Sequence, residues 1–262
     1  MSFTELLENL PIPGVFVAFA LLALLLYEVG FRIGRWWQRR TPEEREGPTG
    51  MLVGSIIALM AFLLAITMGM ATDRFDTRRA LVLAEANSIG TTYLRAGYLP
   101  EPASERSQEL LRAYVPLRIA PDGATELGTQ LEESDTILAE LWSIAKALAR
   151  ETPDSEMLAL YVEALNETID LDTSRVTAAM YARVPETVLL LLFVGAALAL
   201  GMVGFNAGLT GRRSPLTAIV MIVVLGAVVA LIVDIDRPRG GTLTVSQQPM
   251  IELQERMEEE AP

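Results

Sequence analysis

Met51–Thr72 (MLVGSIIALMAFLLAITMGMAT) runs directly into Asp73–Gly97 (DRFDTRRALVLAEANSIGTTYLRAG), and these two stretches decide the fold of the chain. The first carries no charged side chain, and about 20 apolar residues are enough to cross a bilayer as a helix. The second is polar but contains no proline, and its apolar residues keep helical spacing. The sequence therefore predicts one long helix, half of it in the membrane and half outside.

The composition indicates a membrane protein with a water-facing portion. Of the 262 residues, 51% are hydrophobic and 21% are charged, which is typical of such proteins. The chain has no His and no Cys, which excludes thiol nucleophiles, disulfides, imidazole bases and the usual zinc and copper sites. No remaining residues form a recognisable nucleophile and base. We therefore expect no enzyme activity, no cofactor and no metal site, and the net charge of −12 argues against nucleic acid as a partner.

Four apolar segments are predicted to cross the lipid bilayer, and the sequence divides around them. Residues 1–11 lack the positive charge of a signal peptide, so the first segment is expected to be a retained span. The parts are a first transmembrane hairpin (1–72, spans about 15–33 and 51–72), an acidic helical extramembrane domain (73–185), a second hairpin (186–234, spans about 187–205 and 216–233) and an extramembrane C-terminal segment with an acidic, frayed tail (235–262).

The segment between spans two and three is predicted to be wholly helical. It contains 19 acidic and 11 basic side chains. Prolines and a glycine separate four expected helices at 73–97, 103–118, 124–151 and 154–183. The apolar residues of the third recur at helical spacing, which favours a bundle with one apolar stripe per helix. The predicted fold class is therefore an all-α membrane protein with four transmembrane helices and a helical bundle inserted between spans two and three.

Arginines in the short connections predict the orientation in the membrane. Seven lie around the two short connections, namely Arg32, Arg35, Arg39, Arg40, Arg45, Arg212 and Arg213. Long loops count little in the positive-inside rule. Both short connections are therefore expected in the cytoplasm, with the termini and residues 73–185 outside the cytoplasm.

The second span presents three faces when it is projected as a helix. A small-residue face (Gly50, Gly54, Ala58, Ala61, Ala65) would let a neighbouring backbone approach closely. A second face (Val53, Ile56, Met60, Leu63, Leu64, Thr67) is expected to meet lipid or other helices. The third face consists of Ser55, Leu59, Phe62, Ile66 and Gly69 and continues to Asp73. It either packs against another helix or lines a pore between subunits, where Phe62 and Ile66 would form an apolar constriction that gates by dewetting.

Charged residues adjoin or enter the spans at three places. Asp73, Arg74, Arg78 and Arg79 form a charged collar just after span two, which either anchors the helix at the interface or concentrates anions at a pore mouth. Glu28 is an intramembrane charge that needs a partner, and Arg32 at i+4 is the expected one. Asp234 and Asp236 follow span four and are expected to pair with arginines or to contribute to a Ca²⁺ site, although two carboxylates alone do not make one.

Two pairs of glycines at GxxxG spacing end the first and third spans. They are Gly30 with Gly34 and Gly204 with Gly208. This spacing lets helix backbones approach closely, and contact within one subunit is its expected meaning.

Three stretches resemble the bestrophin-like family of bacterial membrane proteins. They are LAEANSIGTTYLRAGYLPEP (83–102), NETIDLDTSRVTAAMYARVP (166–185) and DIDRPRGGTLTVSQQPM (234–250). The resemblance implies four spans with a central helical insertion. It also implies a distant relation to bestrophins, which are pentameric anion channels whose second-span helices line a hydrophobic neck. Phe62 and Ile66 correspond to that neck by position. Bestrophins keep their termini and helical domain in the cytosol, the opposite of the orientation that the arginine count predicts.

These observations lead to two hypotheses about function. The first is a homo-oligomeric ion channel in the bacterial plasma membrane, pentameric by family analogy, which conducts small inorganic anions. The second is a non-conducting module that presents an acidic helical bundle to a partner protein from a membrane base.

Overall fold

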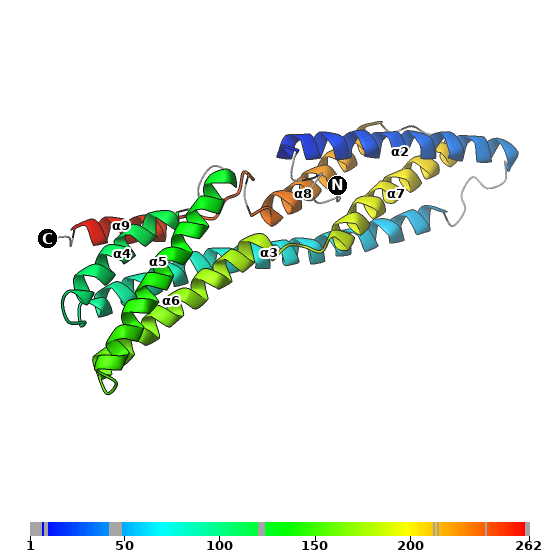
Figure 1. The fold of residues 1–262 in the computed structure, drawn as a ribbon. Helices are drawn as coiled ribbons and strands as arrows, with labels where there is room; N and C mark the ends of the chain where they lie inside the picture. The colour runs from blue at the N-terminus through cyan, green and yellow to red at the C-terminus, as the bar shows by residue number, and fades with distance from the viewer. Residues whose placement is uncertain are drawn as a thin grey trace. The chain divides into compact units, whose positions relative to one another are not determined.

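The structure is a computed structural model that describes residues 7, 10–41, 49–119, 124–211, 213, 215–238 and 240–259. Its regular elements, over these residues, are all helices (Figure 1). They are α2 (Ile12–Arg40), α3 (Thr49–Ala96), α4 (Ala103–Leu117), α5 (Ala124–Glu151), α6 (Glu156–Met180), α7 (Glu186–Thr210), α8 (Pro215–Asp236) and α9 (Gln248–Glu259). Helices α2, α3, α7 and α8 are long and apolar enough to cross a membrane, which confirms the all-α class with four candidate spans.

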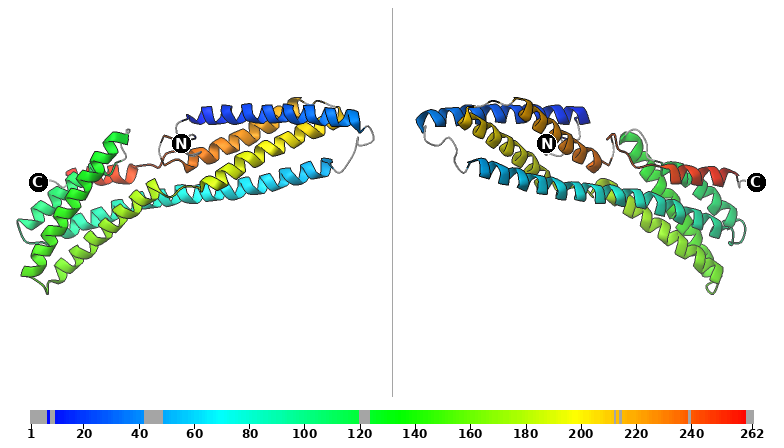
Figure 2. Two further views of the ribbon diagram at one scale, coloured as in Figure 1. Left: turned by 45° about the vertical axis from the view of Figure 1, so that its right-hand side comes forward. Right: turned by 180° about the vertical axis from the view of Figure 1, so that it is seen from behind.

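Helix α3 is continuous from Thr49 to Ala96, as the two opening stretches predict (Figure 2). The chain forms two compact units, and α3 contributes to both. Unit 1 comprises Met1–Phe75 and Arg183–Thr244, and unit 2 comprises Asp76–Ala182 and Val245–Pro262.

The core of unit 1 draws on all four candidate spans. Its buried side chains include Phe19 of α2, Met60 and Leu64 of α3, Leu192 and Leu200 of α7, and Ile232 of α8. Phe19 and Phe193 meet edge to face, with ring centroids 5.9 Å apart, a geometry that aromatic pairs prefer.

Helices α2 and α7 approach so closely that their backbones touch. A Cβ atom at Gly30 would overlap the carbonyl oxygen of Gly201, and one at Gly204 would overlap that of Tyr27. Gly34 and Gly208 have equally little room, against Phe205 and Phe31. The two GxxxG pairs therefore make a contact within one chain, as their spacing predicts.

Unit 2 has a separate hydrophobic core. Fully buried side chains come from α3 (Ile89), α4 (Tyr114), α5 (Leu141), α6 (Tyr161) and α9 (Met250). Ser155 caps the start of α6, because its hydroxyl oxygen accepts a hydrogen bond from the backbone N–H of Leu158 at 3.2 Å.

The expectation of a frayed C-terminal tail is wrong for residues 251–259, because the chain is helical from Gln248 to Glu259. They belong to α9, whose Met250, Leu253 and Met257 are all at most 3% exposed. Their spacing of three and four residues places them on one face of the helix. The high charge of the segment obscured this narrow apolar face.

Candidate functional site

The membrane part of α3 is buried on one side only. Val53, Met60, Leu64 and Thr67 are at most 8% exposed, and Ile56 and Leu63 pack against the core of unit 1. This is the face that the projection assigns to lipid or helix packing, and helix packing is what the structure shows.

The candidate pore face of α3 is open to solvent in the single chain. The side chains of Leu59, Phe62 and Ile66 are 58%, 61% and 45% exposed, and Ser55 and Gly69 are exposed as well. Ser55 donates its hydroxyl to the backbone carbonyl of Met51 at 3.0 Å, which satisfies its donor within the helix. All five residues lie on one side of α3, and none of them is buried by the described residues of the chain.

The small-residue face of α3 does not bring a neighbouring backbone close within the chain. A Cβ atom at Gly50 or Gly54 would have no described atom within 4 Å. Ala58, Ala61 and Ala65 are likewise exposed. Small-residue spacing predicts close helix contacts at two places. The contact between α2 and α7 occurs within the chain, whereas the described residues make no such contact with the small-residue face of α3.

The charged collar is divided among different sides of α3. Asp73 and Arg79 are exposed and Arg74 is half-buried. Arg78 is only 6% exposed, and its Nη1 donates to the carbonyl oxygen of Ala182 at 3.5 Å. The four side chains therefore differ in exposure and do not all lie on one side of α3.

Glu28 has two arginine partners. Its Oε1 lies 3.0 Å from Arg32 Nε and 3.1 Å from Arg213 Nη2. The guanidinium carbon of Arg213 also lies 4.1 Å from the ring centroid of Phe31. The partner at i+4 follows from the spacing, whereas Arg213 could not be inferred because it comes from the connection between α7 and α8.

The two acidic residues at the end of α8, Asp234 and Asp236, accept hydrogen bonds from backbone N–H groups. Asp234 accepts hydrogen bonds from the backbone N–H of Thr242 at 2.7 Å and of Leu243 at 3.3 Å. Asp236 accepts from the N–H of Val184 at 2.8 Å. Arg237 donates to the carbonyl oxygens of Leu7 and Leu10. Among the described residues no group of three or more metal-ligating side chains gathers here or elsewhere.

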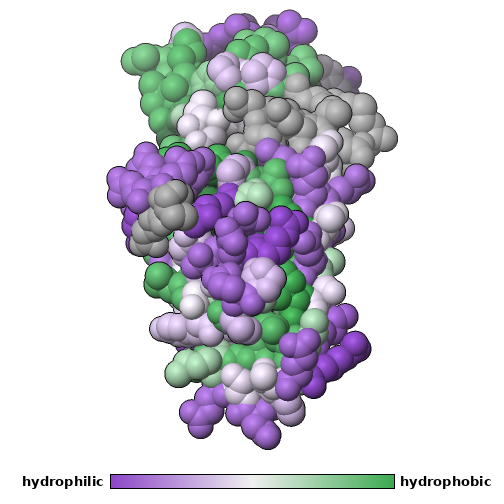
Figure 3. Space-filling model, turned by 60° about the vertical axis from the view of Figure 1, so that its left-hand side comes forward, coloured by the Kyte–Doolittle hydropathy of each residue, from purple (hydrophilic) through white to green (hydrophobic). Residues whose placement is uncertain are grey.

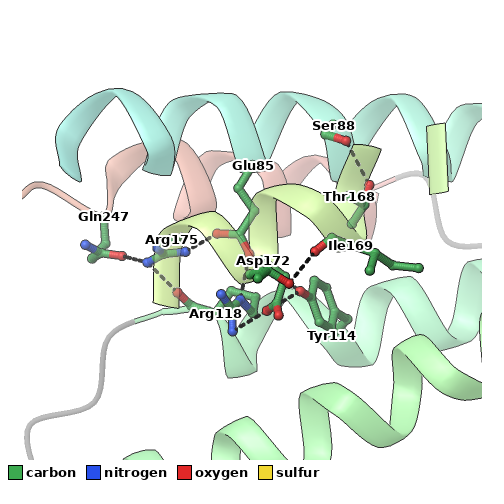
Figure 4. Close-up of polar contacts among 10 residues, drawn as sticks. Glu85, Ser88, Tyr114, Arg118, Thr168, Ile169, Asp172, Arg175 and Gln247 are labelled. Carbon is green, nitrogen blue, oxygen red and sulfur yellow. Dashed lines mark hydrogen bonds and ion pairs between the residues drawn. The ribbon is translucent and has the colours of Figure 1, made fainter. Parts of the chain in front are cut away.

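Unit 2 contains a buried charge network that sequence reasoning missed (Figure 4). Glu85 of α3 is fully buried, and its two carboxylate oxygens lie 2.7 Å from Arg118 Nε and 2.5 Å from Arg175 Nη1. Arg118 Nη1 lies 2.8 Å from Asp172 Oδ1. Two arginines and two carboxylates thus compensate each other, as buried charges require.

The network also ties the end of the chain into unit 2. Arg175 Nη2 donates to Gln247 Oε1 at 2.7 Å and to the carbonyl oxygen of Arg118 at 2.9 Å (Figure 4). Gln247 directly precedes α9. One signal in the sequence pointed here: Glu85 stands alone among small and apolar residues in the stretch from Ala80 to Ala86.

Two groups of the network have shifted pKa values. Burial raises the pKa of Tyr114, whose hydroxyl donates to Asp172 at 3.0 Å. Burial also raises the pKa of the Asp172 carboxyl group, against the opposing influence of the Arg118 charge. The tyrosine thus stays neutral, and the network acts to hold α3, α4 and α6 together.

A hydroxyl cluster lies beside this network. Thr168 Oγ1 is 2.8 Å from Ser88 Oγ and 2.9 Å from Thr92 Oγ1, and all three side chains are buried. It joins α3 and α6 (Figure 4).

Hydrophilic side chains cover much of the face seen in Figure 3, with hydrophobic patches between them.

Comparison with known proteins places the chain in a family. No curated protein matches the sequence. Crystal structures of a bacterial bestrophin homologue from Klebsiella pneumoniae share the fold. One, of a point variant, has a TM-score of 0.65 at 18% identity and covers 92% of this chain and 97% of that one. Another, phased from zinc, has a TM-score of 0.65 at 18% identity and covers 94% of this chain and 99% of that one. The family model for the Bestrophin-like domain matches residues 14–250, so the chain belongs to the Bestrophin-like family.

Proposed function

We propose that the protein is a homo-oligomeric ion channel of the bacterial plasma membrane, with a pore lined by α3. The observation that carries the proposal is the exposure of Leu59, Phe62 and Ile66 on a span whose opposite side is buried in unit 1. Copies of the chain arranged around an axis would bring this face together. A pentamer is the number that the family analogy suggests.

Phe62 and Ile66 are the residues proposed to form the narrowest part of the pore. They are one helical turn apart and more exposed than the core side chains beside them. A ring of such side chains would exclude water when closed and admit hydrated ions when slightly widened. The resemblance to bestrophins suggests anions as the conducted species.

A second candidate function is a non-conducting interaction module. The observation that favours it is a set of large exposed hydrophobic side chains on unit 2: Leu94 is 62%, Tyr98 58% and Tyr181 78% exposed. Large apolar side chains that stay exposed are candidate contacts for a partner protein where they lie together. A monomer without conductance would favour this function over the channel.

The arginine count supports an orientation with unit 2 outside the cytoplasm. Because the chain has no native Cys, single cysteines test this with an impermeant thiol reagent on intact cells. Ser143 of α5 and Thr210 at the end of α7 are exposed positions, whereas Ser134 is only 1% exposed and unsuitable. We expect Ser143→Cys to be labelled and Thr210→Cys to be protected. The reverse pattern would place unit 2 in the cytosol.

Ion flux from liposomes tests the channel function. Purified protein reconstituted into salt-loaded vesicles is expected to release ions faster than protein-free vesicles. Crosslinking of the same preparation reports whether several chains assemble. Flux equal to that of empty vesicles across pH, voltage and Ca²⁺ concentration would contradict the proposal.

A further inference from the structure

We propose that the C-terminal end of α2 binds the phosphate group of an anionic phospholipid through Arg35 and Arg39, beside the ring of Trp36. The site lies within unit 1 and does not depend on whether the protein conducts ions. Its ligand is a lipid with two acyl chains and a negatively charged headgroup.

The exposed side of α2 changes from aliphatic to aromatic to basic over its last three turns. Val29, Ile33, Trp36 and Arg40 lie within about 60° of one another around the helix, and all four are exposed. Aliphatic side chains suit the acyl chains of a lipid, Trp is enriched at the level of the headgroups, and Arg recognises phosphate. This side of α2 therefore presents its groups in the same order as a phospholipid does.

Three arginines form a stripe next to Trp36. Arg32, Arg35 and Arg39 are spaced by three and four residues, lie within about 60° of one another around the helix and are exposed. Arg32 is paired with Glu28 at 3.0 Å, whereas Arg35 and Arg39 form no ion pair with any described residue. Like charges at this spacing repel each other. An anion bound between Arg35 and Arg39 would remove that repulsion.

The acidic residue nearest to this stripe is already engaged. Glu28 is the one acidic residue of α2, and its Oε1 also lies 3.1 Å from Nη2 of Arg213. Residues 28–46 and 211–214 together contain seven arginines and four glutamates. The positive charge at this end of the spans therefore exceeds what the chain itself supplies to balance it, and a headgroup of opposite charge complements it.

The aromatic ring and the helix end determine how an anion would be held. The guanidinium carbon of Arg40 lies 4.0 Å from the centroid of the Trp36 ring, a cation–π contact that keeps this charge at the level of the ring. The last carbonyl groups of a helix carry partial negative charge and repel anions. The attraction must therefore come from arginine side chains, whose forked N–H groups match two phosphate oxygens.

The test uses the tryptophans of the chain as reporters. The protein has three, at positions 36, 37 and 142, so full-length Trp142→Phe retains only those at the end of α2. Its fluorescence is measured in vesicles of phosphatidylcholine or phosphatidylglycerol with brominated acyl chains, which quench a nearby indole. Quenching should give an affinity for phosphatidylglycerol about fivefold or more above that for phosphatidylcholine, because one arginine near a membrane surface contributes about that factor.

Two double variants in this background locate the preference. Arg35→Gln with Arg39→Gln should lower the ratio of the two affinities about fivefold. Arg150→Gln with Arg256→Gln removes the same charge from exposed positions of unit 2 and should leave the ratio unchanged. Circular dichroism checks that each variant is folded. Inorganic phosphate, compared with chloride at equal ionic strength, should not reduce the quenching by brominated phosphatidylglycerol.

Each contrary result overturns a stated part of the proposal. Equal affinity for the two lipids would remove the lipid site. A ratio that survives loss of Arg35 and Arg39, or that falls equally in the unit 2 variant, would show that these two arginines do not form it. Reduced quenching with inorganic phosphate would make the ligand a free anion rather than a lipid. None of these readouts requires ion flux, so failure of the channel proposal would leave the lipid site standing.

Discussion

Arg118 donates its Nε to Glu85 Oε1 at 2.7 Å inside unit 2, where Glu85 is fully buried and Arg118 only 6% exposed. Removing one partner leaves the other as an uncompensated buried charge, which costs about 3–5 kcal/mol. We expect Glu85→Ala to lower the free energy of unfolding of unit 2 by about that amount, measured by circular dichroism during unfolding in detergent micelles.

Arg106 and Glu140 provide a matched control for that prediction. Arg106 Nη2 and Glu140 Oε1 are 2.7 Å apart, but their side chains are 50% and 43% exposed. Exposed pairs contribute about 0–1 kcal/mol, so Glu140→Ala should have little effect. Equal losses in Glu85→Ala and Glu140→Ala would contradict a special role for the buried network.

Asp172 should make the stability of unit 2 depend on pH. Burial raises the pKa of its carboxyl group above the ordinary value, so the folded state binds this proton more tightly than the unfolded state does. Its contribution to stability is therefore greatest below the ordinary carboxyl pKa and declines as pH rises through the raised pKa. Asp172→Asn should flatten this part of the pH profile of unfolding.

Asp170 supplies the control for the pH experiment. It lies on the same helix, is exposed, and accepts a hydrogen bond from Asn166 Nδ2 at 3.2 Å. Asp170→Asn should retain the pH profile of the wild type. If Asp172→Asn retained it as well, the raised pKa would not be contributing to stability.

Gly30 and Gly204 should tolerate no side chain. A Cβ atom at either position overlaps a backbone carbonyl oxygen of the facing helix, so α2 and α7 would have to separate. Overpacking of this kind costs about 1–3 kcal/mol or more, and Gly30→Val should reduce the thermal stability of the purified protein. Gly54→Val is the control, because no described atom lies within 4 Å of its Cβ position. Unchanged stability in Gly30→Val would contradict the close contact.

Met250 should anchor α9 to unit 2. Its side chain is fully buried, while that of the adjacent Ile251 is 36% exposed. Truncation of a buried Met to Ala costs about 2–5 kcal/mol, so Met250→Ala should destabilise unit 2 far more than Ile251→Ala does. The comparison is made by unfolding in detergent. Two equal and small effects would restore the idea of a frayed tail.

The features predictable from sequence were those set by local pattern. The apolar run of Met51–Thr72 and the proline-free continuation to Gly97 were enough to predict α3 as one helix. The GxxxG spacing predicted close helix contact because only glycine allows backbones to touch. The i+4 spacing of Glu28 and Arg32 predicted their pair for the same local reason.

The features that were missed depend on contacts between distant parts of the chain. Glu85, Arg118 and Arg175 come from α3, the end of α4 and α6. Neither their ion pairs nor the hydrogen bond from Arg175 to Gln247 produces a periodic pattern in the sequence. Helix α9 was missed because three apolar residues among many charges resemble a solvated tail. On α3, the burial of Arg78 depends on its contact with the carbonyl oxygen of Ala182, 104 positions further along the chain, so the sequence near Arg78 could not show it.

Single-channel recording of the purified protein in planar bilayers tests the central claim most directly. The account predicts unitary currents that change in conductance or gating in Phe62→Ala and Ile66→Ala. It predicts no change in Val220→Ala, which removes a side chain of similar exposure, 51%, from α8. Currents that neither Phe62→Ala nor Ile66→Ala alters would contradict the pore face on α3, and a bilayer as silent as one without protein would contradict the channel itself.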